Sequence, residues 1–212
     1  MELDQYTQQI RPLNEDAVTA AWTHWDSLCK PLRGMGRLEE MAVQLAGIYG
    51  TAKLGEIADL KPGVAIMGAD NGVVEEGVSQ TGSEVTAQVL ENMGDRKSSV
   101  CIMSKQMGIE VIPVNIGMFV DGKHPRIWNR VVRYGTANMA KEPAMTREEA
   151  VKAIETGIQV VKDLYEAGCR MIITGEMGIG NTTPSSAMAA AGQGCSRGNR
   201  SGCGTFQRRT GA

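Results

Sequence analysis

The stretch Thr174–Met188 combines residue types that could bind an anion, TGEMGIGNTTPSSAM. Three glycines surround one acid, Glu176, and hydroxyl-bearing residues follow. Pro184 suits the first position of a helix, and Thr183 suits the N-cap before it. A helix N-terminus behind a glycine turn offers N–H groups and the positive end of the helix dipole to an anion. Because no lysine follows the glycines, as it would in a nucleoside-triphosphate loop, we predict a monophosphate or carboxylate site, with a ligand-free tight turn as the alternative.

A second polar stretch, residues 68–93, carries several acids and a loop rich in hydroxyl and amide groups. Asp70 directly follows an apolar run, and we expect it to be a buried structural acid. The adjacent Glu75 and Glu76 are typical of solvated surface. The alternative is that this loop, which leads to Glu84, binds a planar base or its ribose beside the phosphate site.

Three short apolar runs predict strands buried on both faces, at residues 62–70, 110–118 and 169–177. Helical patterns separate them: two helices at 83–107, divided near Gly94, and one at 146–167, opened by a capping box formed by Thr146 and Glu149. Alternating strands and helices predict an α/β fold, a Rossmann-like parallel sheet flanked by helices. Ligands of such sheets bind beyond the carboxyl ends of the strands, where both polar stretches begin.

The N-terminal residues predict a small helical subdomain. Residues 12–30 have helical spacing with Asn14 as N-cap, and a second helix starts near Leu38 after a proline and two glycines. The residues expected to pack between these helices are Trp22, Trp25, Leu38, Met41 and Leu45.

Composition narrows the class of protein. The 22 lysines and arginines against 24 acids lack the basic excess of a nucleic-acid or anionic-membrane binder. Without a signal peptide or an apolar run long enough for a membrane span, we expect a cytoplasmic protein. The five cysteines form no C-x-x-C pair and only two histidines are present, so we predict no disulfides, no metal site and no cofactor. Cys101 and Cys169 are expected in the core.

Several segments resemble the nicotinate-nucleotide–dimethylbenzimidazole phosphoribosyltransferases of cobamide (vitamin B12) lower-ligand assembly. They are ADNGVVEEGV, EVTAQ, GEMGIGNTTPSSA and, with more departures, KPLRGMGRLEE. The resemblance spans roughly residues 12–191. It implies transfer of phosphoribose from nicotinate mononucleotide to 5,6-dimethylbenzimidazole, giving α-ribazole 5′-phosphate and nicotinate. Because the donor's pyridinium leaves without pyrophosphate, no metal is implied, and the proton lost by the acceptor implies one carboxylate base.

The resemblance also implies which residues bind the substrates. The ribose and phosphate of the mononucleotide would lie against Glu176, Met177, Gly178, Ile179, Gly180, Asn181, Thr182 and Thr183. The benzimidazole would lie near Thr81, Glu84 and Gln88. A homodimer is implied, with small-molecule substrates and neither nucleic acid nor membrane as partners.

Two features depart from the family. Asn71 stands where the family usually has histidine, which leaves the role of that position open. The family's catalytic glutamate lies far beyond the signature, so no catalytic residue is assigned in this chain. Glu176 is expected to support the pocket and not to act as the base. We therefore expect a helical segment at 1–58 and an incomplete phosphoribosyl-binding α/β domain at 59–191, with little transferase activity and poor solubility.

The last residues, 192–212, are rich in glycine and arginine without apolar periodicity, and we expect a disordered, aberrant tail. Degenerate codons from Ala191 onward, read one nucleotide later, permit a sequence that resembles the family's continuation. We therefore expect a frameshift product from about residue 190, which sequencing of the coding DNA tests. Two other functions stay open: a non-catalytic ligand-binding or regulatory chain, and a dinucleotide-dependent oxidoreductase, against which the missing G-x-G-x-x-G motif argues.

Overall fold

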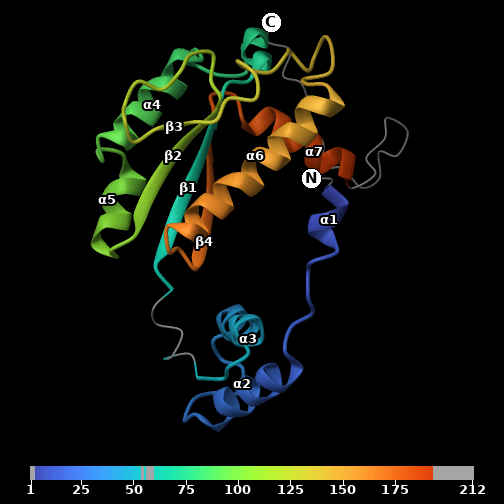
Figure 1. The fold of residues 1–212 in the computed structure, drawn as a ribbon, viewed down its shortest axis with the longest axis vertical. Coiled ribbons are helices and arrows are strands. Elements are labelled where there is room, and N and C mark those ends of the chain that lie inside the picture. The colour runs from blue at the N-terminus through green and yellow to red at the C-terminus, as the bar shows by residue number, and fades with distance from the viewer. Residues whose placement is uncertain (1–2, 54, 56–59, 193–212) are drawn as a thin grey trace, which may run out of the picture. The chain divides into compact units, whose positions relative to one another are not determined.

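The computed structural model describes residues 3–53, 55 and 60–192 and divides the chain into two compact units. The first comprises Met1–Lys61 with Ala167–Met171, and the second comprises Pro62–Glu166 with Ile172–Ala212. Figure 1 shows helices in the first unit and a sheet with helices in the second. The predicted aberrant tail lies, from residue 193 onward, outside the described residues.

The first unit contains α1 (Leu3–Thr7), α2 (Glu15–Ser27) and α3 (Arg37–Tyr49). Asn14 caps α2 as predicted, because its Oδ1 accepts the backbone N–H of Ala17 at 2.9 Å. The chain leaves α3 through Gly50, whose φ of 68° is the left-handed conformation that glycine adopts at low cost. Both predicted helices are therefore confirmed.

The packing between α2 and α3 was predicted only in part. Ala21, Val43 and Ala46 form the buried cluster, and Trp22 and Trp25 pack against it. The prediction is wrong for Leu38 and Met41, which are 54% and 55% exposed, while Leu45 is half-buried. A two-helix pair buries one stripe of each helix, and these residues lie outside the stripe of α3 that α2 covers.

The second unit is built on a four-stranded sheet of β1 (Pro62–Ala69), β2 (Glu110–Gly117), β3 (Trp128–Asn129) and β4 (Met171–Met177). The strand order is β3-β2-β1-β4, and β2 pairs in parallel with both β1 and β3. The three predicted strands and the parallel α/β fold are confirmed. The two-residue β3 was missed, because so short a strand has no periodicity to detect.

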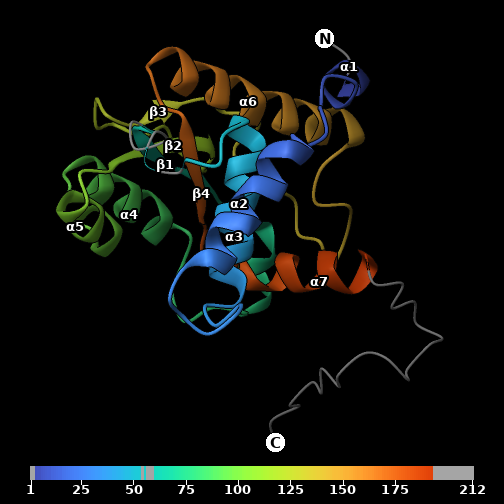
Figure 2. The same cartoon turned by 90° about the horizontal axis from the view of Figure 1, so that it is seen from below.

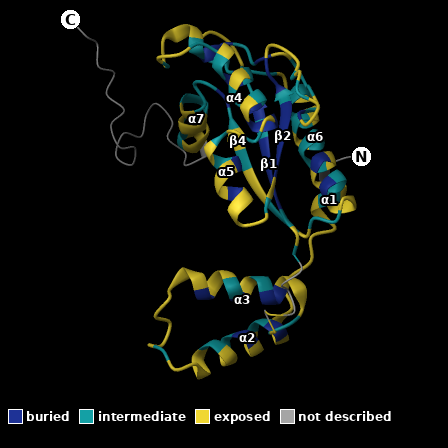
Figure 3. Ribbon diagram, turned by 90° about the vertical axis from the view of Figure 1, so that its left-hand side faces the viewer, coloured by how far each residue is buried: buried dark blue, intermediate teal, exposed yellow. Residues whose placement is uncertain are grey.

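Helices cover the sheet on both faces. Figures 2 and 3 show α4 (Glu84–Gly94) and α5 (Ser99–Gln106) on one face and α6 (Arg147–Glu166) on the other. The predicted capping box opens α6: Thr146 donates its N–H to Glu149 Oε2 at 2.8 Å, and Glu149 donates its own to Thr146 Oγ1 at 3.2 Å. The 3₁₀ helix η2 (Gly72–Glu76) and α7 (Thr182–Gly192) follow β1 and β4.

The core lies between the central strands and α4 and α5. Val64, Ile66 and Val111 from β1 and β2 are buried with Cys101 of α5, as predicted for that cysteine. Two burial predictions are wrong. Cys169 is only half-buried, and three of the seven residues of β4 are exposed. β4 is open because it lies at the edge of the sheet, a position that an apolar run cannot reveal.

Candidate functional site

The candidate site lies where the strand order of the sheet reverses. The chain places β2 on one side of β1 and β4 on the other, so the strand order reverses at β1. Such a switch point is where doubly wound sheets bind ligands. Asp70 and Asn71 follow β1, and the Gly178 loop follows β4, so both predicted polar stretches start at this point.

The signature turn, residues 178–181, follows β4 directly. β4 continues to Met177, the predicted end of this strand, so Gly175 and Glu176 lie in the strand. The helix α7 starts at Thr182, which makes Asn181 the cap and Pro184 the third helical residue, in place of the predicted Thr183 cap and first-position proline. Proline fits there because N–H groups of the first helical turn have no acceptor within the helix.

Close packing and backbone conformation require two glycines of the turn. A Cβ on Gly178 would lie 2.2 Å from the backbone oxygen of Ala69, so only glycine lets the turn reach β1. Gly180 has a φ of +79°, which strains other residues. The turn is thus fixed against the end of β1.

Two side chains from outside the turn hold the polar groups of Ile179. Its backbone N–H donates to Thr86 Oγ1 at 3.1 Å, and its carbonyl accepts a hydrogen bond from Asn71 Nδ2 at 3.0 Å. Thr86 is fully buried on α4. Thr86 is not among the predicted site residues, because one buried hydroxyl in a helix leaves no pattern in the sequence. The sequence left the role of Asn71 open, and in the structure this residue donates a hydrogen bond to the turn that follows β4.

The predicted mononucleotide-binding residues occupy different environments. Glu176 is exposed, and its Oε1 accepts a hydrogen bond from Asn181 Nδ2 at 2.6 Å. Met177 packs against two apolar clusters of the second unit. The N–H groups of Asn181 and Thr183 donate to the carbonyls of Gly178 and Gly180, so in this conformation both already have acceptors.

The predicted benzimidazole-binding residues lie on and before α4. Glu84 and Gln88 are exposed and one helical turn apart, and the exposed Thr81 precedes them in a turn where its N–H donates to Ser79 Oγ at 3.3 Å. No hydrogen bond among the described residues joins these three side chains to residues 176–183. Thr86, on the same helix, makes that link.

Asp70 is buried, as predicted, at the end of β1. Its Oδ2 accepts the backbone N–H of Phe119 at 2.9 Å, and its own N–H donates to Gly117, so it ties β1 to the loop after β2. Its Oδ1 is also buried, and no described residue donates a hydrogen bond to it.

The adjacent glutamates are exposed, as predicted, but both have partners. Asn138 donates to Glu76 Oε1 at 2.7 Å, and Lys141 Nζ lies 3.0 Å from Glu75 Oε2. The hydrogen bond from Lys141 lowers the pKa of Glu75 below its ordinary value, with Asn138 as the next cause. These contacts fasten residues 138–141 to η2 and give the two carboxylates a structural role.

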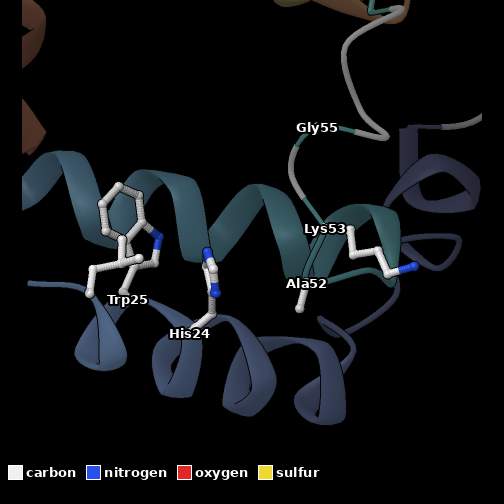
Figure 4. Close-up of a pocket in the computed structure, with 6 residues that line it drawn as sticks. His24, Trp25, Ala52, Lys53 and Gly55 are labelled. Atoms are coloured by element: carbon white, nitrogen blue, oxygen red, sulfur yellow. The ribbon is translucent and has the colours of Figure 1, made fainter.

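A cavity of about 350 Å³ lies apart from these residues, in the first unit. Figure 4 shows His24 and Trp25 of α2 on its wall with Ala52, Lys53 and Gly55. None of the predicted site residues lines it, so it is not the predicted phosphate site.

The described residues contain neither a metal-binding cluster nor a helix that could span a membrane. In the part of the chain that the structure describes, no group of three histidine, cysteine or acidic side chains is placed to hold a metal ion. None of the helices found there has the length and apolar character needed to span a membrane.

A Rossmann-like sheet with a glycine turn at its switch point defines a class of phosphate- or nucleotide-binding α/β proteins. Comparisons with known proteins narrow that class. A profile of the family described as phosphoribosyltransferase matches residues 10–211. The chain belongs to this family.

Named relatives support the same assignment. The chain is 47% identical over 186 residues to the nicotinate-nucleotide–dimethylbenzimidazole phosphoribosyltransferase of Clostridium tetani, covering 88% of this chain and 51% of that protein. It is 44% identical over 190 residues to the enzyme of the same name from Ruminiclostridium cellulolyticum, covering 90% and 53%. The crystal structure of the Thermus thermophilus enzyme of that name superposes with a TM-score of 0.78 at 35% identity, covering 86% of this chain and 55% of that one. The chain thus spans about half the length of the curated relatives it matches.

Proposed function

We propose that this chain carries the mononucleotide-binding part of an enzyme of cobalamin synthesis. The reaction is transfer of phosphoribose from nicotinate mononucleotide to 5,6-dimethylbenzimidazole, with α-ribazole 5′-phosphate and nicotinate as products. The observation that supports it is the signature turn, held by Asn71 and Thr86 at the switch point of the sheet. The relatives bear this activity in their names.

In this proposal the turn and the first residues of α7 receive the mononucleotide. Because the N–H groups of Asn181 and Thr183 already have acceptors, the phosphate is bound through the hydroxyls of Thr182 and Thr183 and the dipole of α7. Glu176, fixed by Asn181, supports the rim of the pocket. Thr81, Glu84 and Gln88 face the benzimidazole, on a helix that Thr86 attaches to the turn.

The proposed transfer needs little acid catalysis, because its leaving group is a pyridinium. A ring nitrogen of the benzimidazole attacks the anomeric carbon of the ribose, the bond from that carbon to the pyridinium nitrogen breaks, and its electron pair stays on nicotinate. The acceptor then gives its N–H proton to a carboxylate base. By resemblance, that base belongs to the part of the family that this chain does not match, so we propose that the 212-residue chain alone turns over slowly. We also propose that the protein forms a homodimer and that it works in the cytoplasm.

Two measurements on the purified chain test this function. Isothermal titration with nicotinate mononucleotide is expected to show binding, with nicotinate alone binding more weakly, and chromatography after addition of dimethylbenzimidazole is expected to show little α-ribazole phosphate. Absence of mononucleotide binding by the folded chain contradicts the assignment of the turn. Rapid product formation contradicts the proposed slow turnover.

A ligand-binding chain without turnover is the second candidate. It is favoured by the coverage of the relatives, because the chain matches only 51% and 53% of their length and the carboxylate base lies, by resemblance, in the rest. Binding that persists with no product, even at high enzyme concentration and long reaction times, supports this candidate over the transferase.

A further inference from the structure

The indole N–H of Trp25, on α2, is a hydrogen-bond donor without an acceptor. Its Nε1 atom is buried, and none of the described residues accepts a hydrogen bond from it. A buried indole N–H normally has a partner, because an unpaired one loses the hydrogen bond that it makes with water in the unfolded chain. Such unpaired groups are few in folded proteins. One that borders a cavity therefore indicates an acceptor on a ligand.

Trp25 forms part of the wall of the cavity of about 350 Å³ in the first unit. Leu28 and Ala52 supply apolar surface to the same wall, and Ala52 packs against the apolar cluster of α2 and α3. In Figure 4 the indole nitrogen of Trp25 lies on the side of the ring that faces the imidazole of His24. Small-molecule sites span roughly 300–1,000 Å³ and combine apolar walls with a few polar groups, and this cavity has both properties.

The charges around Trp25 do not favour an anion. Lys30 Nζ lies 5.5 Å from the centre of the Trp25 ring, but it is paired at 2.9 Å with the fully buried Glu39. An ammonium neutralised in this way attracts a second anion only weakly. Lys53 also lines the cavity, and in Figure 4 its side chain extends away from Trp25. The ligand that fits is therefore uncharged, apolar over most of its surface and able to accept one hydrogen bond.

We propose that this cavity binds a small neutral aromatic heterocycle, with one or two fused rings and a ring nitrogen that accepts the indole N–H of Trp25. Contact with the indole and with Leu28 buries the apolar part of the ligand and supplies most of the affinity. The hydrogen bond supplies the selectivity, because a ring without an acceptor leaves the N–H unpaired. None of the predicted substrate-binding residues lines the cavity, so this site does not depend on the transferase activity proposed above.

Nuclear magnetic resonance of the isotope-labelled 212-residue chain tests the site directly, because three tryptophans give three indole N–H signals. Quinoline is the probe, since it has an acceptor nitrogen and no N–H of its own. We expect quinoline to shift the Trp25 signal downfield with saturation and to leave the signal of Trp128, in the second unit, unchanged. Indole has two fused rings and no acceptor nitrogen, and it is expected to bind about tenfold more weakly.

Four results of these titrations would overturn the proposal. Quinoline at millimolar concentration leaves the Trp25 signal in place, indole binds as tightly as quinoline, or the Trp25 and Trp128 signals shift alike. The fourth is a Trp25 N–H that is already hydrogen-bonded and protected from exchange with water before ligand is added, because the chain itself then fills the cavity.

Matched variants separate the cavity from the rest of the surface. Trp25→Phe keeps an aromatic ring without the N–H and is expected to weaken quinoline binding about tenfold by isothermal titration. Trp22→Phe makes the same change on α2 at a ring that the guanidinium of Arg33 covers at 3.4 Å, and it is expected to change affinity by less than about twofold. If Trp25→Phe does not fold by circular dichroism, Ala52→Leu, which adds volume at the cavity wall, replaces it.

Equal affinities of the cavity variant and Trp22→Phe for quinoline contradict the proposal. Nicotinate mononucleotide is titrated into the same variants and is expected to bind each as it binds the parent. Failure of the cavity site is thus distinct from failure of the proposed transferase site.

Discussion

Thr86 Oγ1 accepts the backbone N–H of Ile179 at 3.1 Å, joining two residues that lie 93 positions apart. Asn71 holds the carbonyl of the same residue from the end of β1. The backbone N–H and the backbone carbonyl of Ile179 are thus both hydrogen-bonded to side chains from outside the turn. The conformation of the turn, and with it the proposed phosphate site, depends on α4 and β1 as much as on the glycines.

Replacing Thr86 by valine removes the hydroxyl with little change of shape. The partly buried N–H of Ile179 is left without its acceptor, so we expect the free energy of unfolding to fall by about 1 kcal/mol. Nicotinate mononucleotide binding is expected to weaken as well, by isothermal titration. Thr86→Ser keeps the hydroxyl and is the control. A Thr86→Val protein as stable as the parent in urea shows that the hydrogen bond is unimportant.

Asn71→Ala removes the donor to the carbonyl of Ile179, and Asn71→His introduces the residue that the resemblance implies for this position. We expect mononucleotide affinity to fall in the alanine variant and to be kept in the histidine variant, whose ring N–H can donate to the same carbonyl. Combined with Thr86→Val, Asn71→Ala is expected to show a coupling energy of about 0.5–1 kcal/mol in a double-mutant cycle. Strict additivity would mean that the two side chains hold the turn independently.

Gly178→Ala tests the close approach of the turn to β1. The added Cβ would lie 2.2 Å from the backbone oxygen of Ala69, so the turn must move. We expect the free energy of unfolding to fall by roughly 1–3 kcal/mol and mononucleotide binding to be lost. Gly157→Ala is the matched control. It lies inside α6, where a Cβ meets nothing within 4 Å, and alanine there is expected to stabilise by about 0.5–1 kcal/mol. Urea denaturation of both variants distinguishes packing from propensity.

The capping box of α6 predicts a pH dependence of stability. The hydrogen bond from the N–H of Thr146 lowers the pKa of Glu149 below its ordinary value, and Arg133 adds to the effect. A carboxyl with a lowered folded-state pKa stabilises the protein above its unfolded pKa of about 4.3, and this contribution is lost as the pH falls through the folded-state value.

Glu149→Gln keeps the hydrogen-bonding geometry of the box but has no charge to titrate. We expect the variant to be less stable than the parent at neutral pH and to approach it in acid, measured as urea midpoints across that range. A stability difference that does not change with pH would show that the carboxylate charge plays no part.

The sequence predicted those parts of the fold that depend on local pattern. Valine- and isoleucine-rich runs gave β1 and β2, and Asn14 and Thr146 marked two helix starts, because capping and strand burial leave short-range signals. Parts that depend on neighbours were not predictable. The exposure of Ile173 follows from the strand order, and that of Met41 from which side of α3 meets α2.

The candidate site was likewise predicted where it depends on local pattern and missed where it depends on distant residues. The glycine turn was found from its composition, although its helix starts at Thr182, two residues earlier than the predicted start at Pro184. Thr86 was missed because its function is defined only by a residue far along the chain. Whether residues 176–183 and the α4 residues bind the two substrates stays a prediction for the titrations above.

The position of β1 in the sheet has a consequence for synthesis on the ribosome. β1 is the first strand made, yet its neighbour β4 follows roughly 100 residues later. At a synthesis rate of about 5–20 residues per second, β1 has no strand beside one of its edges for on the order of ten seconds. During that interval β1 and β2 must be shielded by α4 and α5 or by a chaperone, so the rate of translation becomes a determinant of yield.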